Sequence, residues 1–148
     1  MRKRILPPTY FVMCLVCEIG LHFAFPVARI VAFPYSLLGI SLIIFGAGLN
    51  VWADSLFKKH RTTVKPHESP TALVTSGAFH LSRHPMYLGM FGILLGAATL
   101  LGSVVTFVFP ILFAILMDAI FIPLEERNLE EIFSERYLDY RKKVRRWI

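Results

Sequence analysis

Polar side chains at the ends of two apolar stretches have the residue types of a binding site for a charged small molecule. The first group, where a polar loop turns into an apolar stretch, is Arg83-His84-Pro85-Met86-Tyr87-Leu88-Gly89. The second, the acidic pair Glu125-Glu126, follows a later apolar stretch. Carboxylates at a helix C-terminus oppose the helix dipole, which costs free energy. Because this placement is costly, it indicates that Glu125 and Glu126 serve to bind a cationic ligand. The plainer alternatives are a solvated helix end for the second group and anchoring at a membrane interface for the first.

Asp118 is a third acidic residue with a candidate role, because it lies within an apolar stretch. A charge at membrane depth is costly and indicates a functional site or a buried pair. Asp118 precedes Glu125 by seven residues, so a regular helix places both side chains on one face. We therefore expect Asp118 to line a cavity with Glu125. Glu18 and His22, four residues apart in another apolar stretch, are expected to pair with each other.

Four stretches with at most one charge each are long enough to cross a membrane. They span 17 to 22 residues, at positions 9–25, 34–53, 85–101 and 103–124. A helix of about 20 apolar residues crosses the hydrocarbon core, with about 17 as the lower limit. Hydrophobic residues make up 55% of the 148, more than soluble domains usually contain. The sequence predicts one all-α integral-membrane domain over residues 1–148, with four transmembrane helices arranged as two hairpins.

Basic residues are distributed unevenly around these spans. The N-terminus, the loop 54–84 and the tail 125–148 fall on one side and hold 3, 5 and 7 lysines and arginines, whereas the opposite side holds only Arg29. The positive-inside rule then places both termini and the polar groups in the cytoplasm. The net charge of +6 suits anionic lipid headgroups. No aromatic-rich pattern of a nucleic-acid-binding protein accompanies it.

The loop and the tail carry patterns of their own. The loop 54–84 is long for a connection, and such loops are usually functional or disordered; its apolar residues indicate that it folds against the rest of the chain. In the tail, apolar residues recur at helical spacing from Leu129 to Val144, which predicts an amphipathic interfacial helix anchored by Trp147. Cys14 and Cys17 have no second ligand pair beside them. They are interpreted as buried apolar residues, and no metal site is predicted.

Three motifs together resemble the isoprenylcysteine carboxyl methyltransferase family and its phospholipid N-methyltransferase relatives. The first two are Leu73-Val74-Thr75-Ser76-Gly77-x-Phe79 and Arg83-His84-Pro85-x-Tyr87-x-Gly89. The third comprises Glu125-Glu126, Leu129, Phe133, Tyr137, Tyr140 and Val144. They cover roughly residues 62 to 146 in the order of the family.

The resemblance implies an integral-membrane methyltransferase that uses S-adenosylmethionine and has no Rossmann domain. Carried over by position, the residues that would bind the cofactor are Leu73, Val74, Phe79, His84, Pro85, Met86, Tyr87 and Glu125. The apolar ones would enclose the adenosine, and the carboxylate would meet the amino-acid end. The ammonium and sulfonium of this cofactor suit carboxylates and the faces of aromatic rings.

The implied acceptor is a lipophilic molecule with an isoprenylcysteine-like carboxylate or an amine head. A carboxylate is already ionised, whereas an amine must lose a proton, for which Asp118 and Glu126 are the candidate catalytic bases. Carboxyl methyltransferases of the family carry an arginine just ahead of the acidic pair, where this chain has the apolar run 121–124. A cavity with Asp118 and no arginine disfavours an anion. This favours an amine-bearing or neutral acceptor, unless Arg83 turns inward.

Two functions of other classes fit the same sequence. One is a membrane reductase that uses a nicotinamide cofactor on a sterol-like lipid, although the chain shows no separate basic cluster for a 2′-phosphate. The other is a non-enzymatic membrane scaffold or sensor. The sequence does not determine the oligomeric state.

Overall fold

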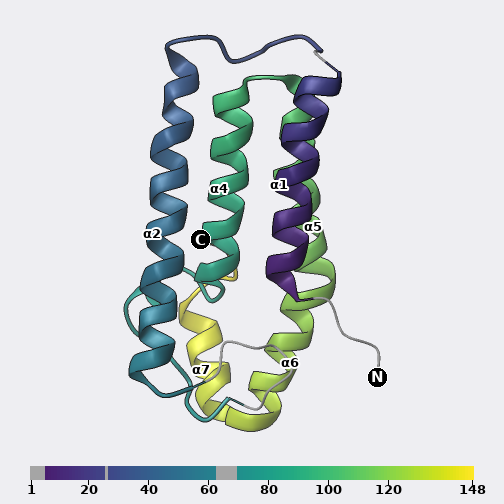
Figure 1. Ribbon diagram of the computed structural model, residues 1–148. Helices are drawn as coiled ribbons and strands as arrows, with labels where there is room; N and C mark the ends of the chain where they lie inside the picture. The colour runs from purple at the N-terminus through teal and green to yellow at the C-terminus, as the bar shows by residue number, and fades with distance from the viewer. Residues whose placement is uncertain (1–5, 26, 63–69) are drawn as a thin grey trace.

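The computed structural model describes residues 6–25, 27–62 and 70–148, and these residues form helices and loops without a named strand. The elements in chain order are α1 (Pro7–Ala24), η1 (Tyr35–Leu37), α2 (Leu38–Lys59), α3 (Ala78–Leu81), α4 (Pro85–Leu101), η2 (Val104–Phe107), α5 (Val108–Leu116), η3 (Met117–Phe121), α6 (Ile122–Phe133) and α7 (Glu135–Lys143). The helices α1, α2, α4 and α5 run alongside one another, and α6 and α7 extend one end of this bundle (Figure 1).

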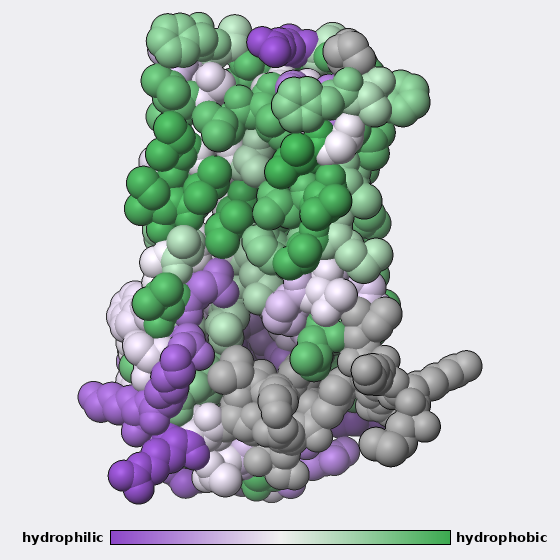
Figure 2. Space-filling view, in the orientation of Figure 1, coloured by the Kyte–Doolittle hydropathy of each residue, from purple (hydrophilic) through white to green (hydrophobic). Residues whose placement is uncertain are grey.

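Three helical stretches are long and apolar enough to cross a membrane, namely Pro7–Ala24, Tyr35–Lys59 and Val104–Phe133. The fourth, α4, has the predicted bounds 85–101 but is shorter, so the four-span arrangement stays a prediction. Apolar side chains cover the sides of the bundle, and polar ones gather at the end where α2 ends and where α6 and α7 lie (Figure 2). We call the end formed by α3, α6, α7, the last turn of α2 and the first turn of α4 the polar end. The far end comprises the connections 27–31 and 102–104.

Glycines bring α2 and α4 into close contact. A Cβ atom on Gly46 would collide with the carbonyl oxygen of Gly89, and one on Gly39 would collide with that of Gly96. Small residues of this kind allow helix backbones to approach each other within a membrane. The contact fixes α4, and with it the polar residues of its first turn, against α2.

The helix that runs from α5 into α6 is widened by one π-helical turn, η3. Pro123 follows it, and proline lacks an N–H and clashes with the carbonyl four residues earlier in a regular helix. A π turn takes up about one extra residue, so positions eight apart now share a face. Asp118 therefore aligns with Glu126 and not with Glu125, and one arginine binds both Asp118 and Glu126. The expectation from regular helix spacing was wrong here.

The tail is not the single helix that its apolar spacing predicts. Helix α6 ends at Phe133, and Ser134 turns the chain with a φ of 44°. Positive φ is unusual for a residue with a side chain. Helix α7 then runs back toward the bundle, and Val144 begins an extended C-terminal segment that returns to α4 (Figure 1). This reversal turns Tyr137 and Tyr140 inward, where both are buried.

The described part of the loop 54–84 folds against the polar end, as its apolar residues predict. Helix α2 continues to Lys59, six residues beyond the predicted boundary at 53. Val74 and Phe79 are buried in a cluster with Leu49 of α2 and the tyrosines of α7. The hydroxyl of Tyr140 donates a hydrogen bond to the carbonyl oxygen of Phe79 at 2.6 Å. This contact ties the loop to the tail.

Backbone hydrogen bonds join the two connections at the far end. Arg29 and Ser103 form an isolated antiparallel bridge, and the N–H of Ile30 donates to the carbonyl oxygen of Gly102 at 2.8 Å. Gly102 takes a left-handed φ of 75°, which ends α4 in a tight turn. The far end is thus closed by the main chain.

Two expectations for α1 were wrong. His22 does not pair with Glu18, because its Nδ1 lies 2.7 Å from the hydroxyl of Ser103. The carboxylate of Glu18 is buried without a hydrogen-bond partner among the residues that the structure describes. Cys17, predicted to be buried, is exposed on the outer face of the helix, and Cys14 is half-buried.

Candidate functional site

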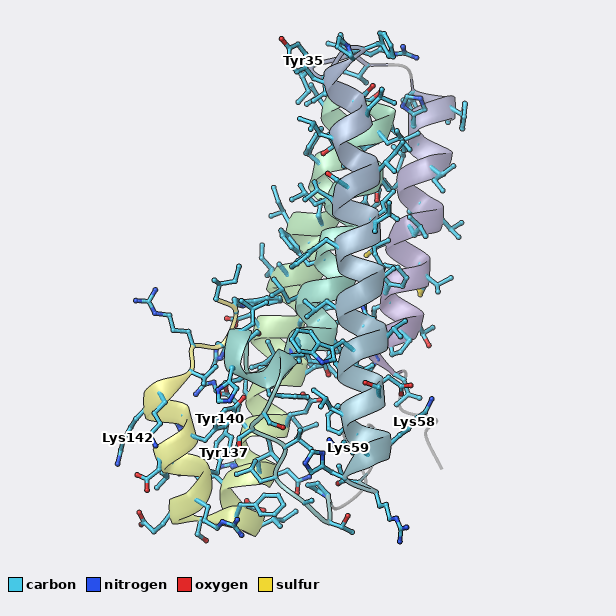
Figure 3. All side chains as sticks on the ribbon, turned by 90° about the vertical axis from the view of Figure 1, so that its left-hand side faces the viewer. Tyr35, Lys58, Lys59, Tyr137, Tyr140 and Lys142 are labelled. Atoms are coloured by element: carbon cyan, nitrogen blue, oxygen red, sulfur yellow. The ribbon has the colours of Figure 1, made fainter. Side chains whose placement is uncertain are left out.

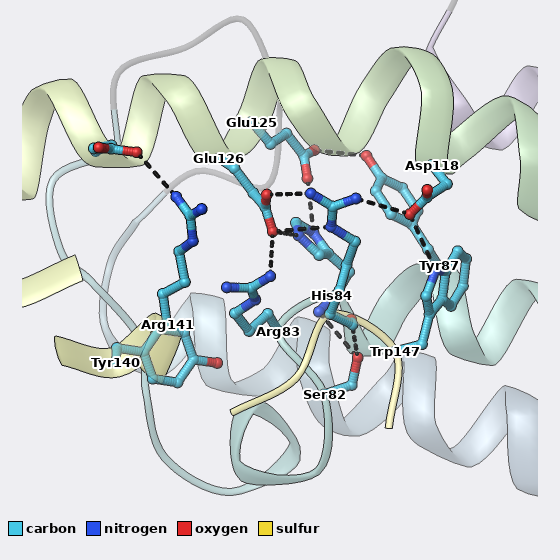
Figure 4. A network of polar contacts seen from close by, with 12 residues as sticks. Ser82, Arg83, His84, Tyr87, Asp118, Glu125, Glu126, Tyr140, Arg141 and Trp147 are labelled. Carbon is cyan, nitrogen blue, oxygen red and sulfur yellow. Dashed lines mark hydrogen bonds and ion pairs between the residues drawn. The ribbon is translucent and has the colours of Figure 1, made fainter. Parts of the chain in front are cut away.

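His84 is fixed at the start of α4 by both its backbone groups. It is the N-cap residue, and Pro85 occupies the first turn, where a missing N–H costs nothing. The N–H of His84 donates to Ser82 Oγ at 3.1 Å, and its carbonyl oxygen accepts from the N–H of Leu88 at 3.1 Å. The imidazole is therefore held where it faces the two glutamates of α6 (Figure 4).

Glu125 lies between an imidazole and a phenol. The hydroxyl of Tyr87 donates to its Oε1 at 2.6 Å, and Nδ1 of His84 lies 3.2 Å from its Oε2. The rings of His84 and Tyr87 are stacked, with centroids 5.7 Å apart and planes 11° apart. Both rings come from the first turn of α4, so this helix start presents a rigid platform to the carboxylate.

Glu126, the next residue, meets a different set of partners. Nη2 of Arg83 lies 2.7 Å from its Oε1, and Arg146 approaches it with Nη2 at 2.7 Å and Nε at 3.3 Å. Nε2 of His84 is 3.5 Å from Oε1, which is too long for a hydrogen bond and acts only as a charge contact. The side chain is only 8% exposed. Glu126 is the shared counterion of the site.

The charges around His84 decide its protonation. Burial alone disfavours the imidazolium and lowers the pKa of His84. The hydrogen bond that His84 donates to Glu125, the neighbouring Glu126 and the negative charges of both carboxylates outweigh burial, so the pKa of His84 is raised above its usual value. The two carboxylates therefore favour the imidazolium form of His84.

A cavity of about 240 Å³ opens beside this platform, many times the space that one water molecule needs. It is mostly apolar, and all eight residues assigned to the cofactor by position line it: Leu73, Val74, Phe79, His84, Pro85, Met86, Tyr87 and Glu125. They come from the loop, from α4 and from α6. The structure therefore brings residues separated by up to 52 positions, from Leu73 to Glu125, to one cavity.

Neither candidate base lines that cavity among the residues that the structure describes. Asp118 lies outside it, 46% exposed, where Arg146 and the indole N–H of Trp147 donate to its Oδ1 at 3.1 and 3.3 Å. Glu126 is held by two guanidinium groups, which occupy the lone pairs that a base would need. The geometry gives both carboxylates a role in binding cations of the chain itself.

Three residues that line the cavity have a buried polar atom left without a hydrogen-bond partner within the described ranges. These atoms are Arg83 Nε, His84 Nε2 and the hydroxyl of Tyr137. Burial, and then the charge of Glu126, raise the pKa of Tyr137 to about 12, so its hydroxyl stays protonated. All three atoms are donors when His84 is charged. Buried donors left without partners are costly, so the cavity fits a ligand that carries acceptor oxygens.

The tail completes the wall of the cavity with Tyr137 and Tyr140 of α7. Tyr137 and Tyr140 turn toward the bundle, whereas Lys142 of α7 and the lysines at the end of α2 point outward (Figure 3). The motif of the resemblance contains both tyrosines, but spacing alone placed them on an interfacial helix. The reversal at Ser134 is what directs them to the cavity.

Sequence reasoning missed the C-terminal residues of the site. Arg146 and Trp147 were assigned to a basic tail and a membrane anchor, yet they bind Asp118 and Glu126. The available signal was the pair of carboxylates eight residues apart, Asp118 and Glu126. The two side chains lie on one face of the helix only because a π turn separates them. Regular helix spacing does not show it.

The chain resembles known proteins over most of its length. The family model described as phospholipid methyltransferase matches residues 34–136. The protein-S-isoprenylcysteine O-methyltransferase of Saccharomyces cerevisiae is 37% identical over 136 residues, which cover 82% of this chain and 54% of that protein. The protein of the same name from Xenopus laevis is 34% identical over 113 residues, or 74% of this chain and 38% of that protein.

A third relative with this name, from Schizosaccharomyces pombe, is 41% identical over 75 residues, which cover 49% of this chain and 30% of that protein. The chain therefore spans about half the length, or less, of the curated relatives it matches.

Proposed function

The chain belongs to the phospholipid methyltransferase family, and we propose that it is an integral-membrane enzyme that uses S-adenosylmethionine to methylate a lipophilic acceptor. The observation that carries the proposal is the cavity lined by all eight residues assigned to the cofactor. The charges and rings of that cavity suit a cofactor with both cationic and anionic groups.

The residues present fit S-adenosylmethionine. Glu125 offers the cavity a carboxylate, with a side chain that is 19% exposed, for an ammonium group. The unpartnered donors of His84 and Tyr137 offer hydrogen bonds to oxygen atoms of the cofactor. Leu73, in the loop, supplies apolar surface for a base and sugar. When bound, this cofactor supplies an electrophilic methyl group on a sulfonium.

An anionic acceptor is favoured over the amine that the sequence suggested. Both premises of the amine argument fail, because Asp118 lies outside the cavity and Arg83 turns inward to line it, with its side chain 9% exposed. A carboxylate head would meet the guanidinium of Arg83, whose Nε has no partner in the described structure. The three curated relatives named as isoprenylcysteine O-methyltransferases support the same choice. We propose a prenylcysteine-like carboxylate as the acceptor.

A carboxylate acceptor removes the need for a catalytic base, because it is ionised at neutral pH. The chain's contribution is then positioning, which can supply roughly 7–11 kcal/mol of a bimolecular barrier. Arg83 orients the acceptor head, and the stacked His84 and Tyr87 hold Glu125 in place. Asp118 and Glu126 take no proton in this scheme.

Membrane orientation is part of the proposal. The basic residues gather at the polar end, where Lys58, Lys59 and Lys142 point outward (Figure 3), and the positive-inside rule places such an end in the cytoplasm. The cofactor would enter the cavity from that side. The acceptor's apolar tail would lie in the bilayer beside the bundle.

The test is methyl transfer from labelled S-adenosylmethionine to two panels of acceptors, prenylcysteine analogues and aminolipids. The proposal expects turnover of prenylcysteine carboxylates, and expects Arg83→Gln to raise the KM for them. Turnover of aminolipids alone would overturn the acceptor assignment. No transfer to any member of either panel would count against the methyltransferase itself.

A further inference from the structure

The last five residues are docked onto the loop that carries His84. The N–H of Arg83 donates to the carbonyl oxygen of Arg145 at 3.0 Å, and Ser82 Oγ donates to that of Arg146 at 2.9 Å. The same Ser82 oxygen accepts the N–H of His84. The C-terminal segment, Val144–Ile148, thus contacts the backbone of Arg83 directly and that of His84 through the hydroxyl of Ser82.

Side chains of the segment anchor it on both sides of these backbone contacts. Val144 is buried in the cluster of Tyr137 and Tyr140. The indole of Trp147 packs edge-on against Phe91 of α4, with ring centroids 6.3 Å apart, and its N–H reaches Asp118. The segment is therefore fixed to α4, to α7 and to the π turn at once.

Arg146 stands at the centre of this arrangement and outside the cavity. Its guanidinium donates two hydrogen bonds to Glu126, through Nε and Nη2, and one to Asp118, through Nη1. A planar fork on a carboxylate fixes orientation as well as charge. Glu126 held in this way keeps its other contacts, to Arg83 at 2.7 Å and to His84 at 3.5 Å.

We propose that Arg146 is a positioning residue, which fixes Glu126 and through it sets Arg83 and His84 for the ligands of the cavity. The inference rests on the proposed function, because it concerns the binding of the same cofactor. Docking of the C-terminal segment is then a condition for ligand binding, although no residue of the segment lines the cavity within the described part of the chain.

The charge of Arg146 also acts on His84. The groups that face this imidazole are Glu125 and Glu126 of α6, Tyr87 of α4, and Arg83 beside it. Arg146 neutralises part of the charge of Glu126. Without Arg146 the carboxylate acts on the imidazole more strongly, so the imidazolium persists to higher pH.

The experiment is calorimetric titration of the detergent-purified full chain with S-adenosylhomocysteine between pH 6 and pH 9. Four proteins are compared: the parent, Arg146→Ala, Arg146→Lys and Arg145→Ala. Arg145 is exposed and contributes only its backbone to the docking, so its variant removes the same charge from the same segment. Its titration is expected to match the parent.

Arg146→Ala is expected to weaken binding about tenfold and to shift the pH dependence of binding to more alkaline pH. Arg146→Lys keeps the charge without the fork, so it should bind with intermediate affinity and keep the parent's pH dependence. Fluorescence of Trp147, measured in a Trp52→Phe background, reports whether the segment stays docked, because the chain has two tryptophans.

Each outcome bears on one of the two proposals. Arg146→Ala with parental affinity overturns the positioning role. Equal losses in both Arg146 variants, without a change in pH dependence, also overturn it and leave a purely structural contact. A parent chain that does not bind S-adenosylhomocysteine overturns the proposed function, and this inference with it.

Discussion

The two ends of the bundle are closed by opposite means. At the far end, single hydrogen bonds suffice: Ser103 is 1% exposed, and it bonds His22 while the neighbouring backbones pair. At the polar end, Arg83, His84 and Glu126 are almost as deeply buried, and all three are charged or chargeable. Burying ion pairs costs desolvation free energy, and apolar residues would often be as stable. Because the far end shows that a helix connection can be closed cheaply, the charges at the polar end indicate function.

Removal of Glu126 gives the sharpest contrast between the ends. Glu126→Ala leaves Arg83, Arg146 and His84 with like charges near one another in a buried place, which we expect to lower the free energy of unfolding by about 3–5 kcal/mol. Glu130→Ala is the control on the same helix, because its pair with Arg141 is about half exposed and such pairs contribute about 0–1 kcal/mol. Equal midpoints of denaturant unfolding in detergent for the two variants would contradict the counterion role.

Binding should depend on the polar end alone. His84→Ala and Glu125→Gln each remove a charged hydrogen-bond partner from the cavity, and we expect S-adenosylhomocysteine to bind about 1.5–3 kcal/mol more weakly. Both variants keep the glycine contact between α2 and α4, so their far-ultraviolet circular dichroism should match the parent. Titration calorimetry measures the affinities, and parental affinity in both variants would show that the cavity is not the cofactor site.

Stability should depend on pH through His84. Because the folded pKa is raised by Glu125 and Glu126, the imidazolium stabilises the fold fully below the unfolded pKa of about 6.5. That contribution is lost as the pH rises through the higher folded value. Unfolding midpoints of the parent should fall across this window, whereas His84→Gln should lack this component. A parent curve with the same shape as that of the variant would remove the electrostatic account of the polar end.

The smallest effect is expected at the far end. Ser103→Ala removes one side-chain hydrogen bond, to His22, and leaves the backbone bridge to Arg29 intact. We expect the free energy of unfolding to fall by about 0.5–1.5 kcal/mol, with no change in affinity for S-adenosylhomocysteine. Unfolding and titration of this one variant check both statements, and a weakened ligand affinity would mean that the two ends are coupled.

Local sequence signals predicted the parts of the site that lie within one element. Pro85 marks the start of α4, and its predicted bounds were confirmed. The eight residues that the resemblance assigns to the cofactor come from the loop, α4 and α6, and they line one cavity. The failures occurred where a backbone departure changes which residues meet. The π turn before Pro123 rotated Asp118 away from Glu125, and the positive φ of Ser134 reversed the tail.

Arg83 and Arg146 show the limit of composition arguments. Both belong to the basic residues of the loop 54–84 and the tail 125–148, and the sequence alone favours lipid headgroups as the partners of such residues. In the structure, Arg83 is drawn inward by Glu126, and Arg146 is brought to the same carboxylate by the reversal of the tail. Which of these basic residues turns inward depends on tertiary contacts that helical spacing does not encode.

The central claim is that the cavity at the polar end binds S-adenosylmethionine. Two separate titrations test this claim most directly. Detergent-purified chain is titrated with S-adenosylhomocysteine and, separately, with NADPH. The account predicts a micromolar dissociation constant for S-adenosylhomocysteine, roughly −8 kcal/mol, and no measurable heat with NADPH. Binding of NADPH in place of S-adenosylhomocysteine would contradict the account and favour a reductase, and binding of neither would favour a membrane scaffold or sensor.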